Sequence, residues 1–208
     1  MKPSTFIFDL GGVLINLNMP RCVQTFNALL GESTAQQLLG TGSSQDILAK
    51  LSIAHNRLLR DYEQGRISSD DFLAALQQLC GRDITAEQVR DAWMSMLDEL
   101  PQARLDFIQS LREKGCRTYL LSNTNEEHWE YIADLYHLPN YFDQLFVSHE
   151  MHLSKPDKAI FDQVAQAIQS DPRITCYIDD LAPNREAAER FVGWRTFPDI
   201  ETLKKYLE

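Results

Sequence analysis

The sequence predicts an α/β protein: a parallel sheet covered by helices on both faces, with an all-helical segment inserted after the first strand. Three observations predict this class. Residues 4–9 have the pattern of a buried strand, the pattern from about Pro20 to Leu100 is helical throughout, and strands alternate with helices after Pro101. Such alternation is typical of βαβ units, whose strands pair in parallel. We expect the first strand to join the same sheet, which makes the helical segment an insertion.

The first strand ends on a single carboxylate, Asp9, within the sequence Thr5-Phe-Ile-Phe-Asp-Leu-Gly-Gly-Val-Leu14. The two glycines that follow let the backbone turn tightly and approach a ligand closely. A charge at the tip of an apolar strand is costly unless it is paired, and a metal ion or a reacting substrate is the usual partner. A glycine turn beside a solvated aspartate is the alternative for this segment alone.

Helix start and stop signals recur through the inserted segment. Ser33-Thr-Ala-Gln36, Ser68-Ser-Asp-Asp71 and Thr85-Ala-Glu-Gln88 resemble N-terminal caps, the first and third with the full capping-box pattern. Gly31 and Gly81 stand where the C-terminal glycines of helices belong. We therefore expect a bundle of roughly four or five helices in this segment.

The elements after Pro101 follow one another in a regular order. A helix over about 102–114 leads through Gly115 to a strand over 117–121. The later elements are a helix over about 126–137, a strand over 144–147, a helix over about 157–169, a strand over 174–178, a helix over about 184–192, a strand over 194–197 and a final helix.

Polar residues follow four of the predicted strands, and ligands of open α/β sheets bind at the carboxyl ends of strands. Asp9 comes first, followed by Ser122-Asn-Thr-Asn125, then Ser154-Lys-Pro156, then Asp179-Asp180. Three acids at one sheet edge would repel one another without a cation, and all-oxygen ligation suits Mg²⁺. Lys155 and Ser122 could hold an anion beside that cation. Each segment alone is also an ordinary turn or helix start, so their common order carries the prediction.

Four motifs in this order resemble those of the haloacid dehalogenase-like hydrolase superfamily. They are Phe8-Asp-Leu-Gly-Gly-Val13, Leu121-Ser-Asn123, Lys155-Pro156, and Ile178-Asp-Asp180 with Asn184. The resemblance covers essentially the whole chain. It implies an α/β fold with a Rossmann-like three-layer core and a parallel sheet.

The chain looks like the branch of this superfamily that carries an inserted α-helical cap just after the first motif. Within that branch it is most similar to the bacterial α-D-glucose-1-phosphatases, through Leu121-Ser-Asn-Thr-Asn125, Glu63-Gln-Gly-Arg-Ile-Ser68 and Lys155-Pro-Asp-Lys-Ala-Ile160. The resemblance implies a core formed by residues 1–17 and 98–208, and a cap formed by residues 18–97.

The resemblance implies an Mg²⁺-dependent phosphatase that acts on a small phosphorylated metabolite, such as a sugar phosphate. Asp9 would attack phosphorus and form an aspartyl-phosphate, while Lys155 neutralises charge on both Asp9 and the phosphate. Ser122 would complete the catalytic set. The phosphate would be held by Leu10, Gly11, Ser122, Asn123 and Lys155, and Mg²⁺ by Asp9, the Gly11 carbonyl and Asp180, with Asp179 supporting the metal from beside it.

Gly11 departs from the family's pattern. Phosphatases of the family usually carry a second Asp two residues after the nucleophile, as general acid and base, and losing such a group typically costs about 10²–10⁴-fold in rate. Either the leaving group needs little help, or a cap residue such as His55, Tyr62 or Glu63 substitutes, or the protein is a weak catalyst or a binding protein. The α-D-glucose-1-phosphatases share this glycine, which favours the first two explanations.

A metal-independent 2-haloacid dehalogenase that uses Asp9 to attack carbon is the alternative enzyme. The missing second Asp favours it, and the Asp179-Asp180 pair argues against it because that chemistry needs no metal. A catalytically weak binding or regulatory protein is the alternative from outside enzymology, and the presence of Asp9, Ser122, Lys155 and Asp180 argues against it.

Composition excludes several kinds of partner. The 208-residue chain has a formal net charge of −10, which disfavours nucleic acid, and it has no run of about 18 apolar residues that could span a membrane. We see no cleavage site of a signal peptide at the N-terminus, and the four cysteines have no zinc-binding spacing. We therefore expect a cytoplasmic protein with reduced cysteines that is a monomer or a weak homodimer.

Overall fold

A computed structural model describes residues 2–30, 56–80 and 84–208. Its five strands form one parallel sheet in the order β3-β2-β1-β4-β5, which confirms the predicted fold class. Phe8 lies opposite Leu120 on one neighbouring strand and Ile178 on the other, so Asp9 and Asp179 leave the sheet side by side. The strands are β1 (Thr5–Phe8), β2 (Arg117–Ser122), β3 (Gln144–Val147), β4 (Thr175–Ile178) and β5 (Arg195–Phe197).

The strand order reverses at β1, because the chain moves outward through β2 and β3 and then crosses to β4 on the other side. The crevice between the carboxyl ends of β1 and β4 is therefore the topological switch point, where ligands bind in open α/β sheets. Each of the two strands that border this crevice is followed directly by an aspartate, β1 by Asp9 and β4 by Asp179.

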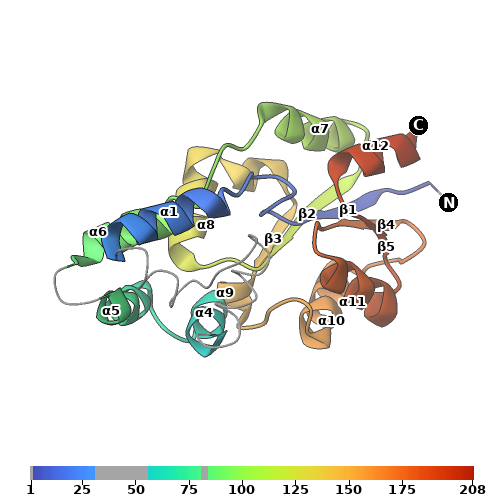
Figure 1. Cartoon of the computed structure of the whole chain (residues 1–208). Coiled ribbons are helices and arrows are strands. Elements are labelled where there is room, and N and C mark those ends of the chain that lie inside the picture. The colour runs from blue at the N-terminus through green and yellow to red at the C-terminus, as the bar shows by residue number, and fades with distance from the viewer. Residues whose placement is uncertain (1, 31–55, 81–83) are drawn as a thin grey trace.

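Side chains alternate between the two faces of the sheet and build two separate cores. Phe6 and Phe8 belong to one buried cluster, with helices α7 (Gln102–Glu113), α8 (Glu126–Leu135) and α12 (Ile200–Leu207). Ile7 belongs to the other, with α10 (Lys158–Ala167) and α11 (Ala182–Val192). Figure 1 shows α7 and α12 above the sheet and α10 and α11 below it. This layering is the three-layer arrangement that the sequence predicts.

Two short elements lie in connections where we expected no regular structure. They are the 3₁₀ helix η1 (Leu138–Tyr141) and the single-turn helix α9 (Ser148–Met151). Apart from these, the predicted elements between residues 101 and 208 are present, with bounds that differ by no more than two residues.

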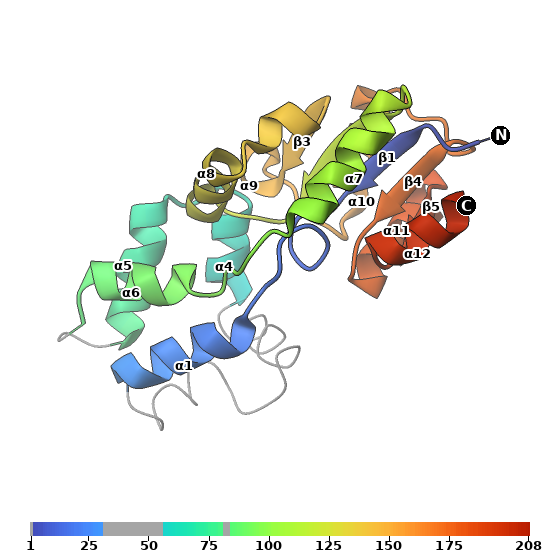
Figure 2. The same ribbon diagram turned by 90° about the horizontal axis from the view of Figure 1, so that it is seen from above.

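The helices α1 (Met19–Leu30), α4 (Asn56–Glu63), α5 (Ser69–Cys80) and α6 (Ala86–Met94) lie together at one side of the sheet (Figure 2). Their side chains form a third buried cluster, which draws only on residues between Met19 and Met96 and includes Phe72 and Trp93. In this segment α6 begins with the predicted capping box, in which Thr85 and Gln88 bond each other's backbone.

The start of α5 is also as predicted, because the Ser68 hydroxyl accepts a hydrogen bond from the Asp71 N–H. The other predicted signals of the segment, Ser33–Gln36, Gly31 and Gly81, lie outside the described residues.

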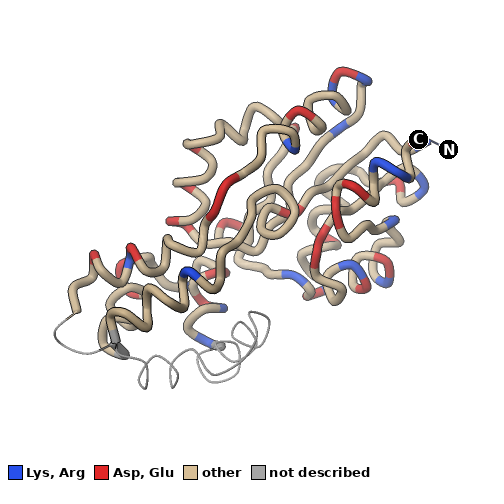
Figure 3. Tube along the Cα trace, turned by 45° about the horizontal axis from the view of Figure 1, so that its top comes forward, with Lys and Arg blue, Asp and Glu red and all other residues tan. Residues whose placement is uncertain are grey.

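The two chain termini lie side by side at the end of the sheet that is far from the helices of the inserted segment (Figure 3). Acidic and basic residues are distributed along the helices rather than gathered on one element. Across residues 2–30, 56–80 and 84–208, no helix is long and apolar enough to cross a membrane.

Candidate active site

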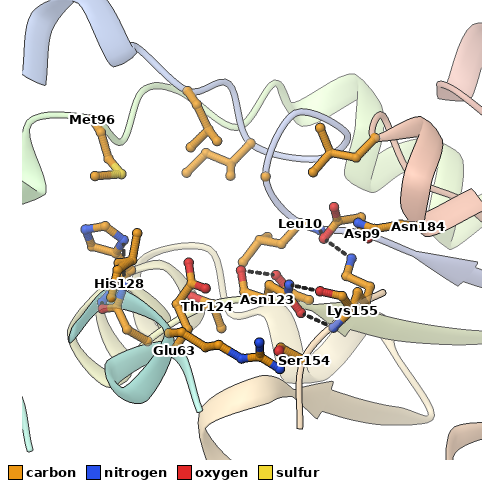
Figure 4. Close-up of a pocket in the computed structure, with 18 of the residues that line it drawn as sticks. Asp9, Leu10, Glu63, Met96, Asn123, Thr124, His128, Ser154, Lys155 and Asn184 are labelled. Atoms are coloured by element: carbon orange, nitrogen blue, oxygen red, sulfur yellow. Dashed lines mark hydrogen bonds and ion pairs between the residues drawn. The ribbon is translucent and has the colours of Figure 1, made fainter. Parts of the chain in front are cut away.

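A cavity of about 660 Å³ lies between the carboxyl ends of the strands and the helices of the inserted segment. Asp9 and Lys155 line it from the sheet side, and Glu63 lines it from the helical side (Figure 4). Ser122 and Trp93 are also lining residues. The cavity is therefore lined by residues from each of the four sequence motifs and from the inserted segment.

Lys155 is the centre of the polar network at the sheet end of this cavity. Its side chain is 1% exposed, and its ammonium lies 3.0 Å from Asp9 Oδ1 and 2.7 Å from Asp179 Oδ2. It also donates to the Leu121 carbonyl at 2.9 Å. An ammonium has three protons, so these three acceptors use all of them and fix the position of the charge.

The Asp179 side chain is fully buried and is surrounded by hydrogen-bond donors. Besides Lys155, it accepts hydrogen bonds from the Leu181 N–H at 2.9 Å, from the Asn184 amide at 3.1 Å and from the Tyr177 hydroxyl. The role of Tyr177 is one that the sequence reasoning missed. Its position two residues before Asp179 on a strand places both side chains on the same face, which is the signal that could have identified it.

The pKa of Asp9 is raised in this network, and the pKa of Asp179 is lowered. Burial raises the pKa of Asp9 to about 7, against the lowering effect of Lys155 and with a further raising effect from Asp179. Burial alone would raise the pKa of Asp179 too, but the Lys155 charge and the hydrogen bonds from Lys155 and Tyr177 lower it below its usual value. Of the two, Asp179 is the permanent counter-charge of Lys155, and Asp9 is the more basic carboxylate.

Asn123 connects the second motif to the third. Its side-chain amide donates to the Lys155 carbonyl at 2.9 Å, and its side-chain oxygen accepts from the Lys155 N–H at 2.8 Å. This pair of hydrogen bonds positions the lysine backbone. The Asn123 N–H itself has no acceptor within the described part of the chain, and the buried Ser122 hydroxyl donates only a long bond of 3.3 Å to the Asn123 carbonyl.

The turn after β1 explains why two glycines follow Asp9. Gly12 has φ +75, and an added Cβ would lie 2.5 Å from Asp180 Oδ2. Gly11 has no such constraint: its φ is not positive, and the nearest atom to an added Cβ is the Leu17 Cδ1 at 3.0 Å, the end of a flexible side chain. Gly12 is required by the backbone and by Asp180, whereas Gly11 could carry a side chain. Leu10 donates its N–H to Asp9 Oδ1 at 2.7 Å.

A divalent cation fits the acids at this sheet edge. Asp9, Asp179 and Asp180 offer ligand atoms that all lie within 4.8 Å of one another, and burial and Asp179 raise the pKa of Asp180. Three carboxylates against the single Lys155 ammonium leave an excess of negative charge that a divalent cation would balance. Because Asp179 is already saturated, the oxygens available to a metal are those of Asp180 and Asp9 Oδ2, which no hydrogen bond reaches within the described residues.

Among its described residues, the inserted segment brings one carboxyl group to the cavity, that of Glu63. Figure 4 shows the Glu63 carboxyl pointing into the open space beside Thr124 and His128. Arg60 also lines the cavity and pairs with Asp157 at 2.8 Å. The other candidates from the sequence differ: Tyr62 is buried, with its hydroxyl bonded to Ser69, and His55 lies outside the described residues.

Comparisons with known sequences agree with this geometry. The sequence profile of the haloacid dehalogenase-like hydrolases matches residues 3–191. The D-ribitol-5-phosphate phosphatase of Bacteroides thetaiotaomicron is 32% identical over 197 residues, which cover 92% of this chain and 89% of that protein.

Solved structures give the same result. A crystal structure of a haloacid dehalogenase family enzyme from Bacteroides thetaiotaomicron, in complex with magnesium and inorganic phosphate, superposes with a TM-score of 0.78 at 30% identity, covering 94% of this chain and 93% of that one. A predicted haloacid dehalogenase-like hydrolase from Porphyromonas gingivalis has the same TM-score and identity, covering 100% of this chain and 99% of that one.

Proposed function

Since the chain belongs to the haloacid dehalogenase-like hydrolase family, we propose that it is an Mg²⁺-dependent phosphatase that hydrolyses a small phosphorylated metabolite through an aspartyl-phosphate on Asp9. One observation carries the proposal: Asp9 has one oxygen held by Lys155 and the Leu10 N–H, and the other oxygen unbonded within the described residues. A carboxylate with one fixed and one unbonded oxygen at a cavity is suited to attack on phosphorus.

The phosphoryl group would lie between Asp9 and the end of β2. The free Asn123 N–H and the Ser122 hydroxyl would donate hydrogen bonds to its oxygens, and Lys155 would neutralise charge on the phosphate and on Asp9. Leu10 and Gly11 would contribute from the turn after β1. The position of Lys155 is fixed, because Asn123 holds the lysine backbone and three acceptors hold its ammonium.

Asp9, Asp180 and the Gly11 carbonyl would hold Mg²⁺, and Asp179 would support the site through Lys155 and Tyr177. The ion would supply positive charge that favours the ionised form of Asp9 and neutralises the phosphate. The magnesium and phosphate in the relative's crystal structure support this assignment.

The substrate class follows from the cavity and the relatives. We place the core at residues 1–17 and 98–208 and the cap at residues 18–97, and the cavity lies where the two meet. A phosphate at Asp9 would leave room toward the cap for an organic group of metabolite size. The relative that acts on D-ribitol 5-phosphate supports a polyol or sugar phosphate. The similarity to α-D-glucose-1-phosphatases stays a prediction.

We place the protein in the cytoplasm, since Cys22, Cys116 and Cys176 are free thiols in the described part of the chain and a reducing compartment keeps them so. Nucleic acid and membranes are not among the proposed partners, and the expected monomer or weak homodimer stays a prediction.

The Asp9→Asn variant tests the proposal directly. Phosphate release from D-ribitol 5-phosphate and p-nitrophenyl phosphate should need Mg²⁺, stop with EDTA, and fall by about 10³-fold or more in the variant, since an amide is a poor nucleophile. The exposed Asp106→Asn is the matched control. Burial raises the pKa of Asp9 in the folded state from 3.8 to about 7, so the stability of the wild type falls as the pH rises between these two values, and the full loss is present at pH 8. The variant has no such ionisation and should melt no lower than the wild type at pH 8.

The alternatives predict different outcomes in the same assay. A folded Asp9→Asn protein with near-wild-type turnover would contradict the nucleophile assignment. Release of halide from 2-haloacids in EDTA, without phosphatase activity, would establish the dehalogenase. A wild type that binds phosphate esters with Mg²⁺ and hydrolyses none of them would establish the binding protein.

A further inference from the structure

The Glu63 carboxyl is a polar group without a partner at the cap end of the cavity. It is half-buried, and within the described residues it makes no hydrogen bond and no ion pair. Burial raises its pKa to about 7, against the lowering effect of the Lys155 charge. A carboxyl group without a protein partner in a cavity is placed to bond a ligand, and one with a pKa near neutrality can both give and take a proton.

The backbone around Glu63 is fastened to the core rather than left to the cap alone. The Ser148 hydroxyl donates to the Glu63 carbonyl at 2.5 Å, and the His152 ring donates to the Gln64 carbonyl at 2.8 Å. The Gln64 amide in turn donates to the Ser154 hydroxyl at 2.6 Å. These three bonds join residues 63–64 to the segment that leads directly into Lys155, so Glu63 keeps its place relative to the reacting end of the cavity.

Gly65 completes this junction. It has φ +61, and an added Cβ would lie 2.1 Å from the His149 carbonyl oxygen. The backbone of the cap and that of the core touch here with no space for a side chain. This contact requires a glycine for two independent reasons, its backbone conformation and its closeness to His149.

The opposite wall of the cavity lacks an acid where a phosphatase of this kind needs one. Gly11 has no side chain. Of the carboxylates that line the cavity on that side, Asp9 is assigned to attack and Asp157 pairs with Arg60, while Asp180, in the acid cluster with Asp9, is assigned to metal binding. We propose, resting on the proposed function, that Glu63 is the catalytic residue that protonates the leaving oxygen and then takes a proton from the hydrolytic water.

The proposed step balances as follows. Asp9 forms a bond to phosphorus while the bond from phosphorus to the ester oxygen breaks, and its electron pair stays on that oxygen. Glu63 gives its proton to this oxygen, which leaves as an alcohol. The Glu63 carboxylate then takes a proton from water as the water oxygen attacks phosphorus, so that inorganic phosphate is released and Asp9 and Glu63 return to their starting states.

The groups that face Glu63 from the neighbouring elements favour this role. Arg60, one turn earlier on α4, is held by Asp157, and Lys155 is held by Asp9 and Asp179, so neither positive charge is free to pair with Glu63. Burial lowers the pKa of His128 to about 4, so this ring, which stacks on Trp93, is neutral near pH 7. Among the described residues that line the cavity, Glu63 is the only acid on the cap side.

The Glu63→Gln variant tests the role with two substrates of similar size, p-nitrophenyl phosphate and benzyl phosphate. Benzyl alcohol is a far poorer leaving group, so its release depends on a proton donor. We expect kcat/KM for benzyl phosphate, which reports formation of the aspartyl-phosphate, to fall by about 10²–10⁴-fold and kcat/KM for p-nitrophenyl phosphate by much less. The hydrolysis of the aspartyl-phosphate is common to both substrates, so kcat falls on both. The decline of kcat/KM above about pH 7 should disappear with the carboxyl. Glu63→Asp should restore part of the benzyl phosphate activity.

Two controls keep the test decisive. Glu113→Gln, an exposed glutamate on α7, should match the wild type on both substrates. Since the variant removes a half-buried acid whose pKa burial raises, Glu63→Gln should melt no lower than the wild type at pH 8, and this melting temperature is the check that the variant folds.

Equal losses of kcat/KM on the two substrates with an unchanged pH profile, or a rise in KM alone, would overturn the proposal and assign Glu63 to substrate binding. A wild type without phosphatase activity on either ester would instead refute the proposed function on which the inference rests.

Discussion

The two ends of the cavity differ in how their polar groups are satisfied. At the sheet end, Lys155 bonds three acceptors, Asp179 accepts from four groups, and Asn123 holds the lysine backbone by two hydrogen bonds. At the cap end, the Glu63 carboxyl has no bond among the described residues, and Trp93 Nε1 is buried without an acceptor. The network at the sheet end fixes Lys155 and Asp179 and leaves Asp9 Oδ2 and the Asn123 N–H unbonded within the described residues, whereas the Glu63 carboxyl and Trp93 Nε1 at the cap end belong to no such network.

This difference separates what is common to the chemistry from what selects the substrate. A saturated network holds its charges in one geometry, which favours electrostatic stabilisation of a transferring phosphoryl group. The unpartnered Trp93 Nε1 on the cap would instead discriminate between organic groups, because a ligand that leaves it unpaired binds poorly. The three predictions below address the sheet end, the turn that connects it to the proposed metal site, and the junction that holds the cap end.

The largest effect should come from removing the charge at the centre of the sheet end. Lys155→Met leaves Asp9 and Asp179 buried without their cation, which should lower the free energy of unfolding by about 3–5 kcal/mol and abolish phosphate release. The loss should be larger at pH 8 than at pH 5, where the two acids can take up protons. Urea denaturation at both pH values measures it.

Lys158→Met is the matched control for that experiment. Lys158 pairs with Asp162 on the surface of α10, with a side chain that is 58% exposed, and such pairs contribute about 0.3–0.5 kcal/mol. If Lys155→Met were as stable as this control at pH 8, the network at the sheet end would not be the structural centre that its contacts indicate.

An intermediate effect should distinguish the two adjacent glycines. A side chain at Gly12 would meet Asp180 at 2.5 Å in a backbone conformation with φ +75, so Gly12→Ala should displace that carboxylate. The Mg²⁺ concentration for half-maximal activity should rise by about 10–100-fold. Gly11→Ala meets only the flexible Leu17 and should raise it much less. Equal Mg²⁺ requirements in the two variants would show that Asp180 does not bind the metal.

The smallest effect should come from the junction between cap and core. Gly65 and Gly115 both have a positive φ. A Cβ added at Gly65 would clash with the His149 carbonyl, whereas a Cβ added at Gly115 would meet no atom within 4 Å. Gly115→Ala should cost about 1–2 kcal/mol for its backbone alone. Gly65→Ala should cost more and also lower kcat for benzyl phosphate, because it moves Glu63.

Comparing Gly65→Ala with Gly115→Ala separates the effect of the contact with His149 from the effect of a positive φ at an alanine. Differential scanning fluorimetry gives their relative stability, and the two-substrate assay gives their leaving-group dependence. A Gly65→Ala protein that matches Gly115→Ala in both measurements would show that Glu63 does not depend on this junction.

Sequence alone predicted the class of fold and the edge of the sheet where the site lies. Apolar strands that end on Asp9 or on Asp179 are local patterns, and parallel strands bring their carboxyl ends to one edge. The order of the strands, by contrast, is a property of the whole sheet, and only the structure gave β1 its place between β2 and β4.

The candidate residues were predicted to different depths. Asp9, Ser122, Lys155 and Asp180 were identified from their motifs, and the structure brings them to one cavity or acid cluster. The sequence showed that Gly11 stands where the family's general acid is expected, and it left three cap residues as candidates to replace that acid. His55 lies outside the described residues, Tyr62 is buried away from the cavity lining, and Glu63 faces the cavity.

What the sequence determined by itself is the set of local features: the strand ends that carry acids, the capping box at Thr85, and the glycine turn after Asp9. Only the tertiary structure decided that Lys155 bonds both Asp9 and Asp179 and that Glu63 stands at the cavity. The hydrogen bonds that hold residues 63–64 join positions 85 to 90 residues apart. No local pattern encodes such contacts, because they depend on how the cap packs on the core.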